Sequence, residues 1–216
     1  MAEINLLKSL PKSKRNITSR EDLKTDEHIN ISRKYGIDYF DGAREYGYGG
    51  YKYDGRWKPV AQDIIDHFNL KKGDKLLDVG CAKGFLVKDL CDLGIEAFGL
   101  DISDYAIKKS MPEIKDRLIK GSADKLPFDD NYFNITISIN TIHNLDRKGC
   151  IKALREISRV SNSGSFIQVD SYLDKKQKEI FESWVLTAKY YGYPNEWLEL
   201  FNEANYTGDW YWTIIK

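Results

Sequence analysis

The stretch Leu76-Leu77-Asp78-Val79-Gly80-Cys81-Ala82-Lys83-Gly84-Phe85 decides the fold of this chain. Its apolar residues run into an acid and then into a turn of small residues, and a helical pattern follows. A second apolar run ends at Asp101, 23 residues after Asp78. An acid at this distance beyond a glycine turn is where ribose hydroxyls are bound. The stretch therefore predicts a nucleotide-like ligand at the end of a buried strand.

The composition narrows the class of protein. The chain has 216 residues, 42% of them hydrophobic, which predicts one folded domain with an extension. Basic and acidic residues number 33 each, and this zero balance argues against a nucleic-acid partner. The three cysteines (Cys81, Cys91 and Cys150) are too scattered for a disulfide framework and predict a reducing, cytoplasmic setting. No apolar run approaches the roughly 20 residues of a membrane helix, so no membrane partner is expected.

The N-terminal part, residues 1–57, reads as a unit separate from the domain at 58–216. Residues 1–20 are basic and lack the apolar stretch of a signal peptide, so they predict a mobile arm. A helix capped by Ser19 is expected over 19–35. An aromatic, glycine-rich stretch follows up to Trp57. Together these segments predict an N-terminal helical and aromatic cap.

From Gly73 onward, strand and helix patterns alternate. Strands are expected at 75–79, 95–100, 116–120, 132–139 and 165–170, with helices at 84–93, 103–110 and 147–159. The tail predicts helices at 174–190 and 194–204 and a last strand at 210–215. This alternation indicates an α/β fold with a doubly wound, mostly parallel sheet, whose ligands lie at the carboxyl ends of the strands. Five polar residues are expected at those ends: Asp78, Asp101, Asp124, Asn140 and Asp170.

The glycine turn argues against a dinucleotide. A pyrophosphate-binding turn has the pattern Gly-x-Gly-x-x-Gly. Counted from Gly80, its second and third glycines are replaced by Ala82 and Phe85. A plain strand–helix turn is the alternative. Gly80, Ala82 and Gly84 instead fit Gly-x-(Gly/Ala)-x-Gly, the turn of class I S-adenosylmethionine-dependent methyltransferases.

Residues 72–170 resemble that family over four motifs in the family's order. The resemblance implies a Rossmann-like fold with S-adenosyl-L-methionine as cofactor. Gly80, Ala82 and Gly84 would lie against its methionine and ribose, and Asp78 would orient the loop or the methionine amine. Asp101 would bind both ribose hydroxyls, and Ile102 would pack on adenine. Gly121 to Phe128 is similar to the adenine loop, in which Ala123 contacts the ring and Asp124 accepts from its amine.

Some of these assignments have alternatives. Asp101 also suits a helix N-cap, and Asp124 suits a turn before Pro127. Phe133 to Asn144 is similar to the fourth strand of the family and its exit, where Asn140 would lie near the sulfonium. Ala82 departs from the commoner glycine of the family. The single last strand departs from the antiparallel hairpin that usually ends its sheet.

The stretch from Tyr46 to Trp57 holds five aromatic residues and four glycines. We expect it to fold over the cofactor as a lid, with Tyr51 facing the sulfonium and Arg56 binding a carboxylate. A packed loop and a single-strand nucleic-acid surface are the alternatives.

His143 follows the fourth strand and is the candidate general base, although it also suits a structural role. The three histidines lack metal-ligand spacing, so no metal is expected.

The expected function is methyl transfer to an oxygen or nitrogen nucleophile of a small molecule. The N-terminal pattern also resembles bacterial methyltransferases of surface-polysaccharide and small-metabolite pathways. Two alternatives remain open: an enzyme that uses the cofactor without methyl transfer, for example by cyclising its aminobutyrate arm, and a non-catalytic cofactor-binding module. The sequence does not indicate an oligomeric state.

Overall fold

The computed structural model describes residues 1–11 and 24–214, and these contain one six-stranded sheet. The strand order is β3-β2-β1-β4-β5-β6, and neighbouring strands pair in parallel. The strands are β1 (Lys75–Val79), β2 (Glu96–Asp101), β3 (Leu118–Lys120), β4 (Phe133–Ile139), β5 (Ser161–Ser171) and β6 (Asp209–Ile214). The predicted doubly wound parallel sheet is confirmed. Its strand order reverses between β1 and β4, and ligands of such sheets bind at this point.

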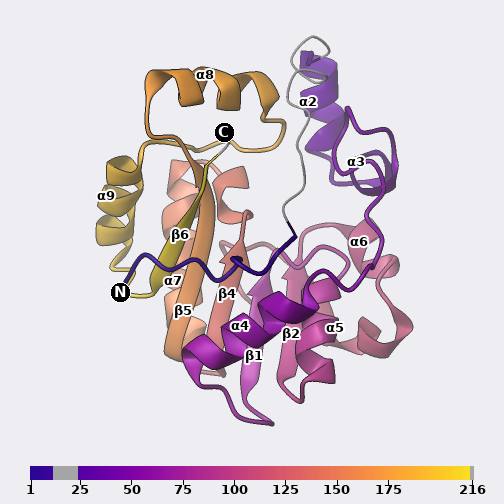
Figure 1. Cartoon of the computed structure of the whole chain (residues 1–216), viewed down its shortest axis with the longest axis vertical. Coiled ribbons are helices and arrows are strands. Elements are labelled where there is room, and N and C mark those ends of the chain that lie inside the picture. The colour runs from indigo at the N-terminus through magenta and orange to yellow at the C-terminus, as the bar shows by residue number, and fades with distance from the viewer. Residues whose placement is uncertain (12–23, 215–216) are drawn as a thin grey trace.

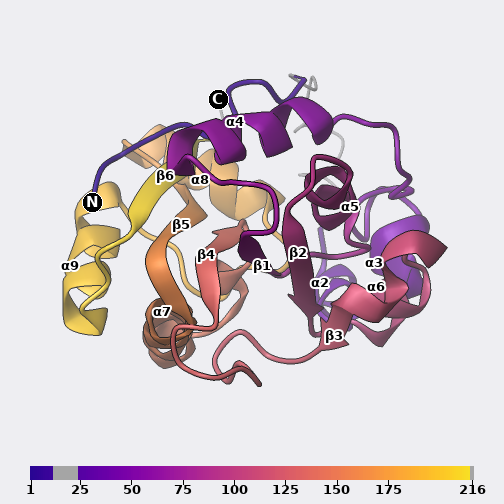
Figure 2. The ribbon, with the colours of Figure 1, turned by 90° about the horizontal axis from the view of Figure 1, so that it is seen from below.

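Helices cover both faces of the sheet. Helices α4 (Lys58–Phe68) and α5 (Phe85–Asp92) lie on one face, and α7 (Arg147–Val160) lies on the other (Figure 2). Helix α9 (Pro194–Ala204) packs against α7. Because β1 is covered on both faces, Leu76, Leu77 and Val79 are fully buried.

Three helices lie beyond the carboxyl ends of the strands: α2 (Asp26–Ser32), α3 (Ile37–Asp41) and α8 (Lys175–Trp184) (Figure 1). Helix α2 begins after Thr25, whose side chain accepts a hydrogen bond from the His28 N–H. The predicted cap Ser19 lies outside the described residues. The short elements α6 (Asp104–Lys108), η1 (Pro112–Arg117) and η2 (Ile142–Asn144) follow β2, α6 and β4.

The sheet edge at β6 is covered by the start of the chain. The Ile4 N–H donates to the Trp210 carbonyl at 2.8 Å, and the Trp210 N–H donates to Ala2 at 3.0 Å. Leu6 packs into the core beneath α4. The division into 1–57 and 58–216 stays a prediction. Within the described residues, no helix combines the length and apolarity that crossing a bilayer requires.

Candidate functional site

The turn after β1 brings the backbone close to the turn after β4. Gly80 has a φ of +86°, and an added Cβ would lie 2.1 Å from Thr141 Oγ1, so only glycine fits. Ala82 has a φ of +52°, a conformation in which glycine is favoured. Its N–H donates to Asp101 Oδ2 at 2.8 Å, which holds the turn in this form.

Gly84 was expected to lie against the cofactor, and in the structure Ile114 lies where its side chain would be. An added Cβ there would lie 2.6 Å from Ile114 Cδ1, so this glycine lets α5 approach η1. Gly84 lines neither of the two cavities at this edge of the sheet. Its contribution is to the packing of the turn.

Asp101 lies at the carboxyl end of β2 with 9% of its surface exposed. Its Oδ1 accepts from the Ser103 N–H at 2.8 Å, and its Oδ2 accepts from Ala82. Burial raises the pKa of the carboxyl group, and these backbone donors oppose that shift. Each carboxylate oxygen has a further lone pair, so the group can also accept from two hydroxyls of a ligand.

Asp78, in β1, is 5% exposed. Burial, together with the charge of Asp101, raises its pKa to about 7. A cation placed beside this carboxyl group would stabilise its ionised form. Asp78 is therefore suited to bind a cationic group of a ligand near neutral pH.

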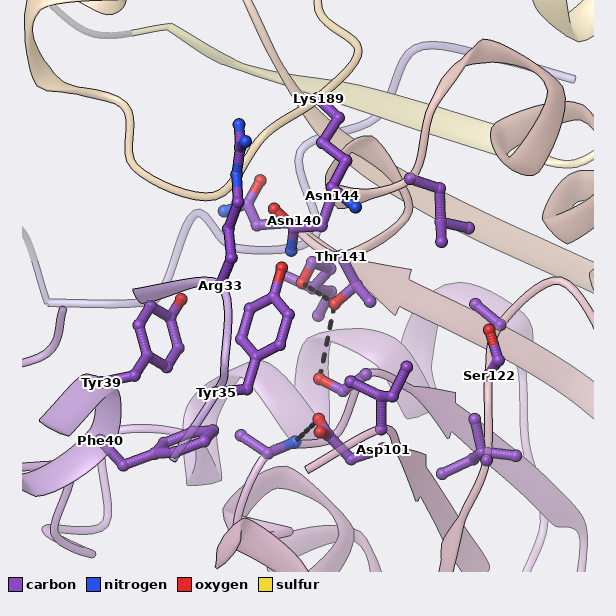
Figure 3. A pocket seen from close by; sticks show the side chains of 18 of the residues that line it. Arg33, Tyr35, Tyr39, Phe40, Asp101, Ser122, Asn140, Thr141, Asn144 and Lys189 are labelled. Carbon is purple, nitrogen blue, oxygen red and sulfur yellow. Dashed lines mark hydrogen bonds between the residues drawn. The ribbon is translucent and has the colours of Figure 1, made fainter. Parts of the chain in front are cut away.

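The first cavity lies between these strand ends and the helices α2 and α3 (Figure 3). Its volume is about 160 Å³, and Asp101, Ile102 and Ala123, three of the residues expected to bind the cofactor, line it. Asp124 does not line it. Its Oδ1 accepts a hydrogen bond from the hydroxyl of Ser122, and Ser122 lines the cavity instead.

A second cavity of about 460 Å³ adjoins the first. Both are lined by the same six residues where they meet: Tyr39, Tyr48, Gly80, Ala82, Ile139 and Asn140. Asn140 has a φ of +51°, and its Oδ1 accepts from the Thr213 hydroxyl at 2.9 Å. Asp78, His143 and Asp170 line the second cavity. An elongated ligand can therefore extend from Asp101 past Asn140 toward His143.

The Tyr46–Trp57 stretch contributes residues to both cavities, and its role as a lid stays a prediction. Tyr51 lines the second cavity, where its ring stacks on Phe85 with 4.8 Å between centroids. Arg56 also lines it, but its guanidinium already binds Asp54, with 2.8 Å between Nε and Oδ2.

Four residues lining the first cavity precede the predicted lid: Arg33, Tyr35, Tyr39 and Phe40. Three of the four are aromatic, and this cluster of aromatic residues in the sequence could have indicated that the segment lines the site.

An ion pair between the buried Lys83 and the more exposed Asp41 joins α3 to the glycine turn. Lys83 Nζ, in the turn, lies 2.6 Å from Asp41 Oδ2 and 2.8 Å from Asp41 Oδ1. The same ammonium donates to the Tyr51 carbonyl at 2.8 Å, and the Tyr105 hydroxyl donates to Asp41 at 2.7 Å. The cap and the turn are thus held together at one point.

His143 is 3% exposed, and its Nδ1 accepts from the Asp170 N–H at 3.2 Å. This bond places the proton of the neutral ring on Nε2. Burial lowers the pKa of the ring, although the Asp170 carboxylate opposes this shift. The geometry does not support the predicted general base, because Nδ1 is engaged and Nε2 already carries a proton. It makes His143 a hydrogen-bond donor.

The residues present fit S-adenosylmethionine. Gly80 leaves no room for a side chain beside Thr141, Asp101 has acceptor capacity for hydroxyls, and Asp78 is suited to an ammonium group. Figure 3 shows the first cavity, with Asp101 and Asn140 on opposite sides of it.

Comparison with known proteins agrees with this geometry. The family model described as "Methyltransferase domain" matches residues 77–169. A sterol 4-C-methyltransferase of Caenorhabditis elegans is 26% identical over 198 residues, 80% of this chain and 58% of that protein. A demethylmenaquinone methyltransferase of Paenarthrobacter aurescens is 29% identical over 121 residues, 54% of this chain and 45% of that protein. This chain spans about half the length of the curated relatives it matches.

Solved structures share the fold. A methyltransferase from Methanosarcina mazei superimposes with a TM-score of 0.53 at 19% identity, covering 65% of this chain and 82% of that one. Residues 77–169 therefore match a methyltransferase domain, and the comparisons support a class I S-adenosylmethionine-dependent methyltransferase, a family whose cofactor is S-adenosyl-L-methionine.

Proposed function

We propose that this chain transfers the methyl group of S-adenosylmethionine to an oxygen or nitrogen nucleophile of a small-molecule acceptor in the cytoplasm. The observation that carries the proposal is Asp101, held by two backbone N–H groups at the mouth of a cavity formed by the glycine turn. The resemblance of the N-terminal pattern to other bacterial methyltransferases suggests that the acceptor belongs to a surface-polysaccharide or small-metabolite pathway. The relatives named for sterol and menaquinone methylation make a carbon nucleophile the competing outcome.

The residues have distinct roles in this proposal. Gly80 and Ala82 would contact the ribose and methionine, and Asp101 would accept from the ribose hydroxyls. Ile102, Ala123 and Ser122 would surround the adenine. Asp78 would bind the methionine ammonium, and Asn140 would lie near the sulfonium. Tyr51 would cover the methionine end.

The cofactor supplies a methyl group that is already activated by positive sulfur. What the protein adds is alignment of the nucleophile with that methyl group, a contribution worth roughly 7–11 kcal/mol when orientation is complete. His143 would donate from Nε2 to the acceptor or to an ordered water, which positions the acceptor without removing its proton. The proton that the acceptor oxygen or nitrogen loses on methylation would pass to water. The second cavity, closed by α3 and the Tyr46–Trp57 stretch, would exclude bulk water.

Calorimetry with S-adenosylmethionine and S-adenosylhomocysteine tests the cofactor site. Asp101→Asn should weaken binding of both by about tenfold or more, because it replaces a charged acceptor of two hydroxyls. Asp104→Asn is the matched control, since Asp104 pairs with Lys120 on the surface. Equal affinity in wild type and Asp101→Asn would overturn the assignment.

Product analysis over a panel of hydroxylated and amino acceptors tests the reaction. S-adenosylhomocysteine with a methylated oxygen or nitrogen supports the proposal, whereas a methylated carbon corrects the acceptor atom. Methylthioadenosine would indicate use of the aminobutyrate arm, and binding without turnover would indicate a non-catalytic module.

A further inference from the structure

We propose that Arg33 and Lys189 form a binding site for an anionic group, a carboxylate or a phosphate, on the acceptor molecule. This inference rests on the proposed function, because it takes the first cavity as the adenosine side of the cofactor site. It adds the charge of the acceptor, which the family model does not specify.

The two cations reach the first cavity from separate parts of the chain. Arg33 is the C-cap residue of α2, and Lys189 follows α8. The Arg33 guanidinium donates to the Ala188 carbonyl at 3.3 Å, so the contact that joins the two segments lies one residue from Lys189. Figure 3 shows both side chains on the side of the cavity opposite Asp101, beside Asn140 and Asn144.

No acidic side chain among residues 1–11 and 24–214 pairs with either cation. Other basic residues near the site differ in this respect, since Lys83 binds Asp41 and Arg56 binds Asp54. Arginine binds carboxylate and phosphate oxygens in a two-pronged geometry, and a lysine adds a point charge. Arg33 and Lys189 are both exposed and line one cavity, so both are accessible to an anion there.

The cofactor does not account for these cations. The only anionic group of S-adenosylmethionine is its methionine carboxylate, and the methionine end is assigned to the second cavity beside Asp78. The adenosine end is uncharged. The anion at Arg33 and Lys189 is therefore assigned to the acceptor.

A buried side-chain oxygen near the two cations could accept a hydrogen bond from another group of the acceptor molecule. Asn144 Oδ1 is buried and has no hydrogen-bond partner within the described part of the chain. Asn144 lines the same cavity. An unpaired buried carbonyl oxygen is costly, and a rotation of the Asn144 side chain toward the cavity that it lines would let a hydroxyl or amine of the ligand pair with it. The acceptor class is thus a small anion that also carries a hydroxyl or amino group.

The site would also link acceptor binding to closure of the cavity. An anion held by Arg33 and Lys189 bridges α2 to the segment after α8, which Arg33 already contacts through Ala188. Exposed cations often contribute little to binding because water solvates them. The test of the site is therefore whether Arg33 and Lys189 together raise the affinity for an anion.

Two-dimensional NMR on the S-adenosylhomocysteine complex of the full chain tests the inference, with inorganic phosphate and 4-hydroxybenzoate as probes. Phenol is the uncharged match of the second probe. The signals to follow are the Arg33 Nε–H and the Asn144 side-chain amide. The test variant is Arg33→Gln with Lys189→Gln. The charge-matched control is Lys34→Gln with Lys176→Gln, because neither residue lines either of the two cavities.

We expect saturable shifts with at least one anion and none with phenol, and a loss of about tenfold in anion affinity in the test variant only. Saturation by phosphate alone or by 4-hydroxybenzoate alone identifies the anion class. Absence of saturable shifts, or equal affinity in the test variant, overturns the inference while cofactor binding stands. A tenfold loss of S-adenosylhomocysteine affinity in the test variant also overturns it, because the cations would then hold the cofactor carboxylate. Failure of S-adenosylhomocysteine to bind wild type refutes the proposed function instead.

Discussion

The ion pair between Asp41 and Lys83 predicts how firmly the cap is held over the glycine turn. Lys83 is 6% exposed, and Asp41→Ala would leave its ammonium with the Tyr51 carbonyl as its remaining hydrogen-bond partner among the described residues. Removing one partner of a buried pair typically costs roughly 3–5 kcal/mol. The Asp41 side chain is 26% exposed, so water can reach the ammonium and the lower limit of about 3 kcal/mol applies.

Amide hydrogen exchange measures this cost directly. The Phe40 N–H donates within α3, and the Tyr48 and Gly50 N–H groups donate to Tyr39 and Phe40. A loss of about 3 kcal/mol in the free energy of opening should speed exchange at these amides by roughly 100-fold. The matched control is Asp92→Ala, whose exposed pair with Lys88 should contribute no more than about 1 kcal/mol.

A double variant completes the test. Lys83→Met with Asp41→Ala removes the uncompensated charge, so exchange should slow again relative to Asp41→Ala alone. The reasoning is refuted if Asp41→Ala and Asp92→Ala speed exchange equally, or if the double variant exchanges as fast as the single one.

Three further predictions concern the site. Asp78→Asn should stabilise the cofactor-free protein at pH 8 but not below pH 4. With its pKa raised to about 7, Asp78 keeps a proton in the folded state that it loses near pH 4 in the unfolded chain. Asp78 therefore lowers the free energy of unfolding increasingly as the pH rises toward 7. Urea unfolding at both pH values checks this, and equal shifts would contradict it. Gly80→Ala should weaken cofactor binding by calorimetry at least about tenfold through its clash with Thr141, whereas Gly73→Ala, with a φ of +90° but open space around it, should not. Nitrogen-15 NMR should find His143 neutral with its proton on Nε2 at pH 7, and a charged ring there would restore it as a candidate base.

The central sheet was predictable because its determinants are local. Helices cover both faces of a parallel strand, so consecutive apolar residues such as Leu76 and Leu77 are both buried there. The turn at Gly80 needs glycine because of its own backbone angle. Spacing along the chain then places Asp101 at the end of the next strand. Most helices were predicted with small errors at their ends, where tertiary contacts set the last turn, but the helix expected over 174–190 ends at Trp184.

The site was less predictable where it depends on contacts between distant segments. Arg33 and Tyr39 were missed because the sequence does not say where the short helices α2 and α3 dock beyond the strand ends. Asp124 matches a motif, yet its carboxylate accepts from Ser122 and does not line the cavity. Arg56 was expected to hold a ligand carboxylate but binds Asp54.

The sequence by itself determined the fold and the cofactor, because a buried strand, a glycine turn and an acid at a set distance act over short stretches of chain. Only the tertiary structure decided the chemistry around the acceptor. The Asp170 N–H, 27 residues from His143, sets the position of that ring's proton, and the contact of Arg33 with Ala188 brings a second cation to the cavity. A proton's position and the convergence of two charges depend on what lies within a few ångströms, and no local pattern specifies those neighbours.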